Sequence, residues 1–345
     1  MSRLFTNDAF KLCLFAAFAF LLAALLTPVI YNIGQFLAEI TANKSINPLI
    51  DYLGKHARKA DFARYFNRSL YLATLILLPL LLLSLDARKN GFFRNGPWSF
   101  ALPARSVASQ LGQPLRQPKH RTLHLLGGFF LAAGLLLLTG FLLVRLEFFQ
   151  WVSEPKTAKI LTNSLTTGAI VALIEEFLFR GILLGIFFRA LRPVLAIVLL
   201  SLLFACLHFM QPPDGLSVSD PEAWTAGFEF LGLIASRFLS PISILFEFTT
   251  LFIVGLILAA TRFATASLWL PIGLHAGWVF ALLTFNGLTD RTTKLPHWTE
   301  LMVGQQLTEG LVPLAALSFT GLVLYLFLRS ENPSQISSAT KSSPL

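Results

Sequence analysis

The chain has 345 residues, of which 55% are hydrophobic and only 13% are charged, and its mean hydropathy is +0.68. Soluble domains average about 25% charged residues, so this composition excludes a water-facing globular protein and indicates an integral multi-pass membrane protein. The formal net charge of +9 comes from basic residues beside apolar segments, which typically meet anionic lipid. We therefore expect membrane lipids as partners and no nucleic acid.

Apolar runs long enough to cross a bilayer, about 20 residues each, recur along the chain. Backbone groups inside a bilayer must be paired within each segment, so we predict helices and an all-α fold, a polytopic transmembrane helical bundle of about eight spans. Residues Ala226–Leu239 are apolar but contain Glu229 and Arg237, which favours an interfacial or re-entrant segment over a ninth span. The eight predicted spans are Ala9–Ile30, Leu70–Leu85, Leu123–Val144, Ile160–Leu191, Val194–Phe209, Ile242–Thr261, Ala266–Phe285 and Leu311–Leu328.

The distribution of Lys and Arg predicts the orientation in the membrane. Residues 86–121 carry seven basic side chains and one acid, which is typical of a cytoplasmic loop, whereas residues 211–222 carry three acids and no Lys or Arg. Counting spans from these segments places both termini in the cytoplasm. The membrane is expected to be a bacterial cell membrane or its equivalent. The loop predicted at Asn32–Ser69 is also basic and does not fit this pattern.

Charged residues interrupt the predicted span Ile160–Leu191. The stretch IEEFLFRG places Glu175, Glu176 and Arg180 among apolar neighbours, and each such group costs about 2.5–3.5 kcal/mol at bilayer depth. Glu176 and Arg180 are four residues apart, so they share a helix face and can form an ion pair. Glu175, about 100° further round the helix, has no partner within the motif, so an ion pair alone explains only one glutamate.

Two histidines lie in later spans at a matching depth. At about 1.5 Å per residue, Glu175 and His208 rise about 26 and 22 Å from the turn at residues 192–193, and His275 rises about 20 Å from the turn at Arg262. A single intramembrane histidine is often only hydrogen-bonded to a nearby carbonyl. Two at the level of a glutamate pair predict a common site, with the catalytic core on the central and C-terminal helices.

Carboxylate and imidazole groups in a dry pocket can activate water. A desolvated glutamate works as a general base near neutral pH, and imidazole can share the proton or stabilise an oxyanion. The same set, Glu175, His208 and His275, also matches a catalytic site for a divalent metal such as zinc with one open position. The residues leave both alternatives open.

The ordered motifs Glu-Glu-x-x-x-Arg, Phe-x-x-x-His and His-x-x-x-(Asn or Asp) resemble those of the CPBP family, the CAAX-protease and bacteriocin-processing (Abi) group. The similarity covers about Leu165–Phe285. It implies an α-helical membrane endopeptidase acting on a membrane-anchored peptide or protein, prenylated or otherwise anchored at its C-terminus. We accordingly divide the chain into N-terminal membrane segments with a basic cytoplasmic loop (1–121), a catalytic membrane domain (122–329) and a Ser-rich disordered tail (330–345).

The resemblance also implies roles for individual residues. Glu175 would activate the water with the help of His208, while Glu176 and Arg180 would support the site. His275 would contribute to an oxyanion hole or, if a metal is used, to its binding.

One position departs from the family pattern. The last motif expects Asn or Asp four residues after His275, and this chain has Val279, which cannot donate a hydrogen bond. Either a neighbour such as Trp278 or Asn286 takes that role, or the chain is a catalytically degenerate member that acts as a membrane scaffold or immunity protein.

Two other classes of protein use intramembrane polar residues. A proton-coupled transporter would also place Glu, Arg and His in its spans, but the sequence lacks the internal repeats typical of transporters. A cysteine-based transpeptidase would use Cys206 with His208, yet residues two apart on a helix do not face each other. Cys206 is better interpreted as a small packing residue.

Overall fold

The computed structural model of the chain describes residues 8–42, 46–85, 121–210, 216–239, 244–292, 296 and 299–331. The chain divides into two compact units, unit 1 with Met1–Gly91 and Met210–Ser240, and unit 2 with Phe92–Phe209 and Pro241–Leu345. Residues 86–120 of the predicted basic loop, residues 211–215 of the predicted acidic loop and residues 332–345 of the predicted tail lie outside the described residues. The division at residues 121 and 329 stays a prediction.

Unit 1 is built from helices. A Phe cluster holds α4 against α12, because the Phe230 ring lies 5.3 Å from the Phe62 ring and 5.1 Å from the Phe66 ring. The predicted loop at Asn32–Ser69 is wrong, since α2 continues to Ile40 and a further helix, α3, follows. The elements are α2 (Asp8–Ile40), α3 (Pro48–Arg58), α4 (Phe62–Ser84), α12 (Ala226–Ser236) and the 3₁₀ turn η2 (Arg237–Leu239).

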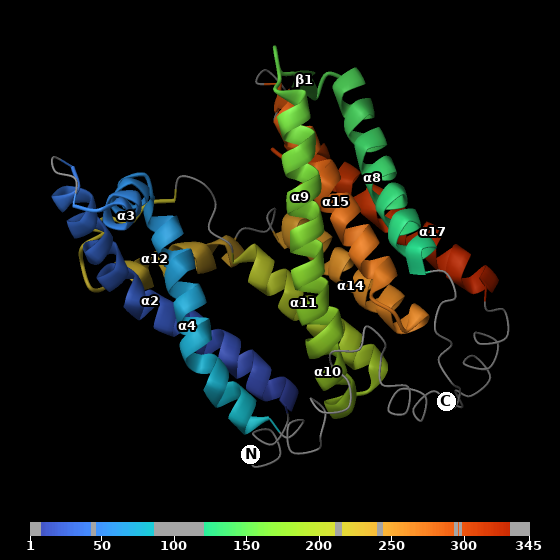
Figure 1. Cartoon of the computed structure of the whole chain (residues 1–345). Helices are drawn as coiled ribbons and strands as arrows, with labels where there is room; N and C mark the ends of the chain where they lie inside the picture. Colours follow the sequence, from blue (N-terminus) through green and yellow to red (C-terminus); the bar gives the residue numbers. More distant parts are fainter. Residues whose placement is uncertain are drawn as a thin grey trace. The chain divides into compact units, whose positions relative to one another are not determined.

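The described part of unit 2 is also mainly helical, and it contains one short antiparallel strand pair, in which Gln150 is opposite Asp290. Helix α15 packs most extensively against α8 and α9, and Figure 1 shows these three helices side by side. The elements are α8 (Arg121–Arg145), β1 (Phe149–Trp151), α9 (Thr157–Glu176), the π-helix η1 (Phe177–Leu183), α10 (Leu184–Ala190), α11 (Pro193–Phe209), the π-helix η3 (Ile244–Phe248), α14 (Thr249–Thr265), α15 (Trp269–Leu288), β2 (Thr289–Arg291), α16 (Thr299–Met302) and α17 (Leu311–Glu331).

The described residues contain six helices that are long and apolar enough to cross a membrane. The all-α bundle is confirmed, but the prediction of about eight spans is not. The run α9–η1–α10 carries three charged residues in its centre, and α11, Pro193–Phe209, has only 17 residues, fewer than the about 20 that a span needs. The six are Asp8–Ile40, Phe62–Ser84, Arg121–Arg145, Leu245–Thr265, Trp269–Leu288 and Leu311–Leu328.

Glycines allow α15 to approach α8 closely. A Cβ atom at Gly273 would lie 2.1 Å from the Leu125 carbonyl oxygen, and one at Gly277 would lie 2.4 Å from the Phe129 carbonyl oxygen. Small residues at helix contacts are typical of membrane bundles, where close backbone packing drives association. Because these two glycines flank His275 on α15, the same contact fixes the height and rotation of that histidine.

Replacing Gly273 with alanine is expected to lower the free energy of unfolding by about 1–3 kcal/mol, the usual cost of overpacking, because the added methyl group meets backbone. Gly134→Ala on α8 is the matched control, since a Cβ there has no heavy atom within 4 Å. Alanine is favoured over glycine in a helix by about 0.8–1.0 kcal/mol, so the control should be slightly stabilised. Thermal unfolding in detergent measures both variants, and equal stability of the two would contradict the packing argument.

Candidate active site

The structure brings the five predicted site residues together within unit 2. Glu175 and Glu176 are the last two residues of α9, and Arg180 lies in η1. His208 is in the last turn of α11, and His275 is near the middle of α15. Three segments that are distant in the sequence therefore meet at one level of the bundle.

The outer pair of the site is Glu175 and His208. The Nε2 atom of His208 lies 3.1 Å from the Oε2 atom of Glu175, and its Nδ1 atom lies 2.9 Å from the Phe204 carbonyl oxygen. A carbonyl can only accept, so Nδ1 carries a hydrogen and the Nε2 of a neutral ring is bare. A hydrogen bond between Nε2 and the carboxylate then requires one further proton, which the two groups share.

The inner part of the site centres on one oxygen atom of Glu176. Its Oε1 accepts hydrogen bonds from Arg180 Nη1 and from His275 Nδ1, both at 2.8 Å. The side chains of these three residues are 0%, 1% and 7% exposed, so they form a buried network. Buried charges need such pairing, and the Nδ1 bond to Glu176 turns the Nε2 atom of His275 toward Glu175.

Glu175 connects the two parts. Its Oε2 atom lies 3.8 Å from His275 Nε2, which is too far for a direct hydrogen bond but close enough for both groups to contact one small molecule. The Glu175 and His208 side chains are 24% and 20% exposed, in contrast to the buried residues behind them. The site therefore has an accessible edge, where Glu175 and His208 share a proton, and a buried part, where Glu176, Arg180 and His275 support it.

The surface beside this edge is apolar. The side chains of α9 and η1 that point outward around Glu175 are exposed large aliphatic residues, namely Ile170, Leu173, Ile174 and Leu178. The accessible edge of the site therefore lies next to an exposed apolar surface.

Two residues of the site were not predicted to act in it. Phe204 stacks against the His208 ring at 4.0 Å between centroids and lies 4.4 Å from the guanidinium carbon of Arg180. Arg262, which the sequence places at a turn, is 1% exposed and its Nε donates to the Arg180 carbonyl at 3.3 Å. The turn predicted at Arg262 is wrong, because α14 continues to Thr265 and Arg262 is buried inside it.

Two residues considered as substitutes for Val279 lie elsewhere. Asn286 Nδ2 donates to Gln306 Oε1 at 3.3 Å, about 16 Å along the helix from His275 at 1.5 Å per residue. Trp278 belongs to the hydrophobic cluster that joins α8, α14, α15 and α17. Val279, one turn after His275 on α15, is partly buried.

The candidate metal ligands were Glu175, His208 and His275. Among the residues that the structure describes, no group of three His, Cys, Asp or Glu side chains has an arrangement that could hold a metal ion. The short contacts are instead hydrogen bonds within the Glu175–His208 and Glu176–His275 pairs. A metal-dependent reaction stays a prediction.

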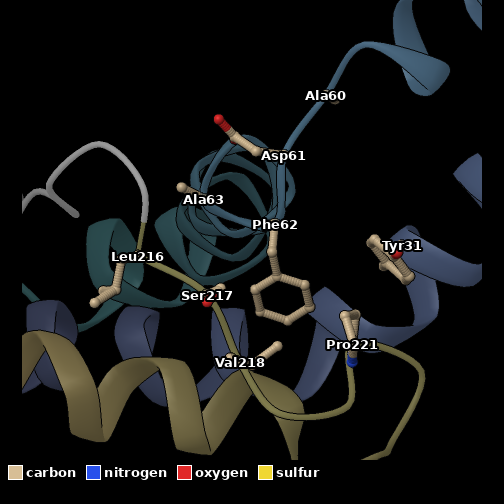
Figure 2. A pocket seen from close by; sticks show the side chains of 9 residues that line it. All are labelled: Tyr31, Ala60, Asp61, Phe62, Ala63, Leu216, Ser217, Val218 and Pro221. Atoms are coloured by element: carbon tan, nitrogen blue, oxygen red, sulfur yellow. The ribbon is translucent and has the colours of Figure 1, made fainter.

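A cavity of about 290 Å³ lies in unit 1, between α2, the start of α4 and residues 216–221. Figure 2 shows the Phe62 ring pointing toward the segment with Ser217 and Val218, with Tyr31 on α2 to one side. None of the five predicted site residues lines this cavity. Its volume alone assigns it no role in the chemistry.

Comparison with protein families identifies the part of the chain that carries the five site residues. Residues 157–281 match the family described as type II CAAX prenyl endopeptidase Rce1-like. These residues form a domain of the CAAX-protease family. The resemblance inferred from the motifs is thereby confirmed, and the family is one of proteases.

The matched CAAX-protease domain contains all five candidate site residues and Val279. It extends from the start of α9, at Thr157, to the middle of α15. Neither the curated proteins nor the solved structures give a match to the chain. Together with the apolar helices, the family establishes an integral membrane protein.

Proposed function

We propose that the protein is an intramembrane endopeptidase that hydrolyses peptide bonds of membrane-associated substrates. The observation that supports this most strongly is the Glu175 carboxylate, which lies between the Nε2 atoms of His208 and His275 at the accessible edge of the CAAX-protease domain. A carboxylate hydrogen-bonded to imidazole in a largely dry site is suited to general base chemistry.

The reaction follows from the protonation states. Glu175 accepts a proton from a bound water as the water oxygen attacks the carbonyl carbon of the peptide bond. His275 acts here with hydrogens on both ring nitrogens: Nδ1 donates to Glu176, and Nε2 donates to the developing oxyanion. The carbon–nitrogen bond then breaks, and the proton held by the Glu175–His208 pair passes to the leaving amine.

The surroundings of the site favour a lipid-anchored substrate. The exposed aliphatic residues beside Glu175 would contact an acyl or isoprenoid anchor, and the family name refers to prenylated CAAX proteins. We therefore propose a prenylated or otherwise C-terminally anchored peptide as substrate, with membrane lipids as the other partner. The protein would lie in a bacterial cell membrane, or its equivalent, with both termini in the cytoplasm.

The test uses purified protein in lipid nanodiscs and a farnesylated peptide ending in a Cys-a-a-X sequence. Mass spectrometry should detect shortened peptide with wild-type protein and none with Glu175→Gln. An unprenylated peptide of the same sequence should be cut more slowly. A chelator distinguishes the alternatives, because loss of cleavage on its addition, restored by zinc, would establish a metal-dependent reaction. Proton-coupled uptake without cleavage would favour a transporter.

Val279 supports a second candidate, a catalytically degenerate scaffold or immunity protein, because its side chain offers no donor one turn from His275. If the oxyanion lacks a donor there, Val279→Asn should raise kcat, by up to about 10²-fold, the effect of a single oxyanion donor. Val279→Ala is the apolar control. An asparagine variant that is folded but no faster than the alanine variant would show that this position does not limit catalysis.

A further inference from the structure

The helix that carries Glu175 and Glu176 changes its hydrogen-bond register directly after them. Helix α9 ends at Glu176 and the π-helix η1 begins at Phe177. At its end, the Leu184 N–H donates to the Phe179 carbonyl, five residues earlier. In an α-helix this N–H would bond to the Arg180 carbonyl. In the π segment, the Arg180 carbonyl therefore does not accept the hydrogen bond from the Leu184 N–H that it would accept in an α-helix.

Arg262 of α14 supplies a donor to that carbonyl. Its Nε lies 3.3 Å from the Arg180 oxygen, and both arginines are 1% exposed. The Arg180 guanidinium also reaches α14, because its Nη2 donates to the Gly255 carbonyl at 3.4 Å. Arg180 is thus held to α14 through its backbone by Arg262 and through its side chain by Gly255, two turns apart on the same helix.

The register change matters for the orientation of the glutamates. One extra residue in a helical turn rotates everything after it by about 100° relative to everything before it. Residues on both sides of η1 face the interior, since Glu176 precedes it and the buried Leu184, Phe187 and Phe188 follow it. If η1 shifted to the α-helical register while the packing held the later residues in place, Glu175 and Glu176 would rotate away from their present directions, which point toward the two histidines.

We infer that Arg262 is a positioning residue, which stabilises the π register and thereby keeps Glu175 and Glu176 directed at His208 and His275. The inference rests on the proposed function for its catalytic consequence. Arg262 acts through the Arg180 backbone, and the Arg180 side chain carries the effect to Glu176 Oε1.

Two variants separate the hydrogen bond from the volume of the side chain. In Arg262→Gln the amide nitrogen lies the same number of bonds from Cα as the arginine Nε, so the donor is kept without the charge. In Arg262→Met the side chain has the same length as glutamine but carries no donor. Hydrogen–deuterium exchange of the whole protein in nanodiscs reports on amides 177–185, and cleavage of the farnesylated peptide gives kcat and KM.

For Arg262→Met we expect exchange of amides 177–185 to be about tenfold faster, the effect of losing one hydrogen bond to a charged group, with little change elsewhere. We also expect kcat to fall at least as much with KM nearly unchanged, and Arg262→Gln to restore both quantities. Equal behaviour of the two variants, or faster exchange spread over the whole bundle, would overturn the inference. Hydrogen–deuterium exchange does not depend on activity. It therefore tests whether Arg262 stabilises residues 177–185 even if the wild-type protein cleaves nothing and the proposed function fails.

Discussion

Replacing Glu175 with glutamine is expected to lower kcat for peptide cleavage by about 10²–10⁴, the usual contribution of a general base. The amide cannot accept a proton from water, although its NH₂ group can still donate to the bare Nε2 of His208. Because the Glu175 side chain is 24% exposed, the free energy of unfolding of the variant should lie within about 1 kcal/mol of that of the wild type. Single-turnover cleavage and thermal unfolding in nanodiscs measure the two effects.

The matched control for this variant is Glu247→Gln, which removes a carboxylate from η3, outside the set of five site residues. It should leave kcat close to that of the wild type. If Glu175→Gln is folded and cleaves at the wild-type rate, Glu175 is not the base, and the reaction must use another group.

Replacing Glu176 with leucine is expected to destabilise the protein by about 3–5 kcal/mol, the cost of leaving one member of a buried ion pair alone. Arg180 is 1% exposed and Glu176 Oε1 is the acceptor of its 2.8 Å bond. The substitution also removes the acceptor of His275 Nδ1, so kcat should fall as well. Chemical or thermal unfolding in detergent measures the stability, and peptide cleavage measures the rate.

The double variant Glu176→Leu/Arg180→Met separates stability from catalysis. Replacing a buried pair with apolar residues is often neutral, so the double variant should recover most of the lost stability. Its kcat should stay low, because His275 still lacks the carboxylate that orients its ring. A single Glu176→Leu variant as stable as the wild type would show that the ion pair has no structural role.

Much of the candidate site could be predicted because charged residues are so costly in a membrane. Glu175, Glu176 and Arg180 are conspicuous in an apolar helix, and simple helical rise placed His208 at the depth of Glu175. The same count for His275 began at Arg262, which lies inside α14 and not at a turn. The regular spacing of apolar runs likewise predicted the long helices α8, α15 and α17. These features depend on composition and on distance along single helices, which a sequence contains directly.

The remaining features depend on contacts between helices. The π register of η1 is set by packing on both sides and by Arg262, whose partner is a backbone carbonyl 82 residues away. Helix α3 was missed because it has only 11 residues, and apolar runs of membrane-spanning length do not reveal a short amphipathic helix. The predicted number of about eight spans is not confirmed among the described residues, where α11 is apolar but has only 17 residues.

The proposal that this CAAX-protease domain is active is tested most directly by comparing peptide termini in host membranes that carry wild-type protein or Glu175→Gln at equal levels. We expect a set of new C-terminal or N-terminal ends with the wild type, sharing one sequence context, that disappears with the variant. Identical sets of termini from two stably folded proteins would contradict the proposal, and would instead support a degenerate member in which Val279 has replaced the missing donor.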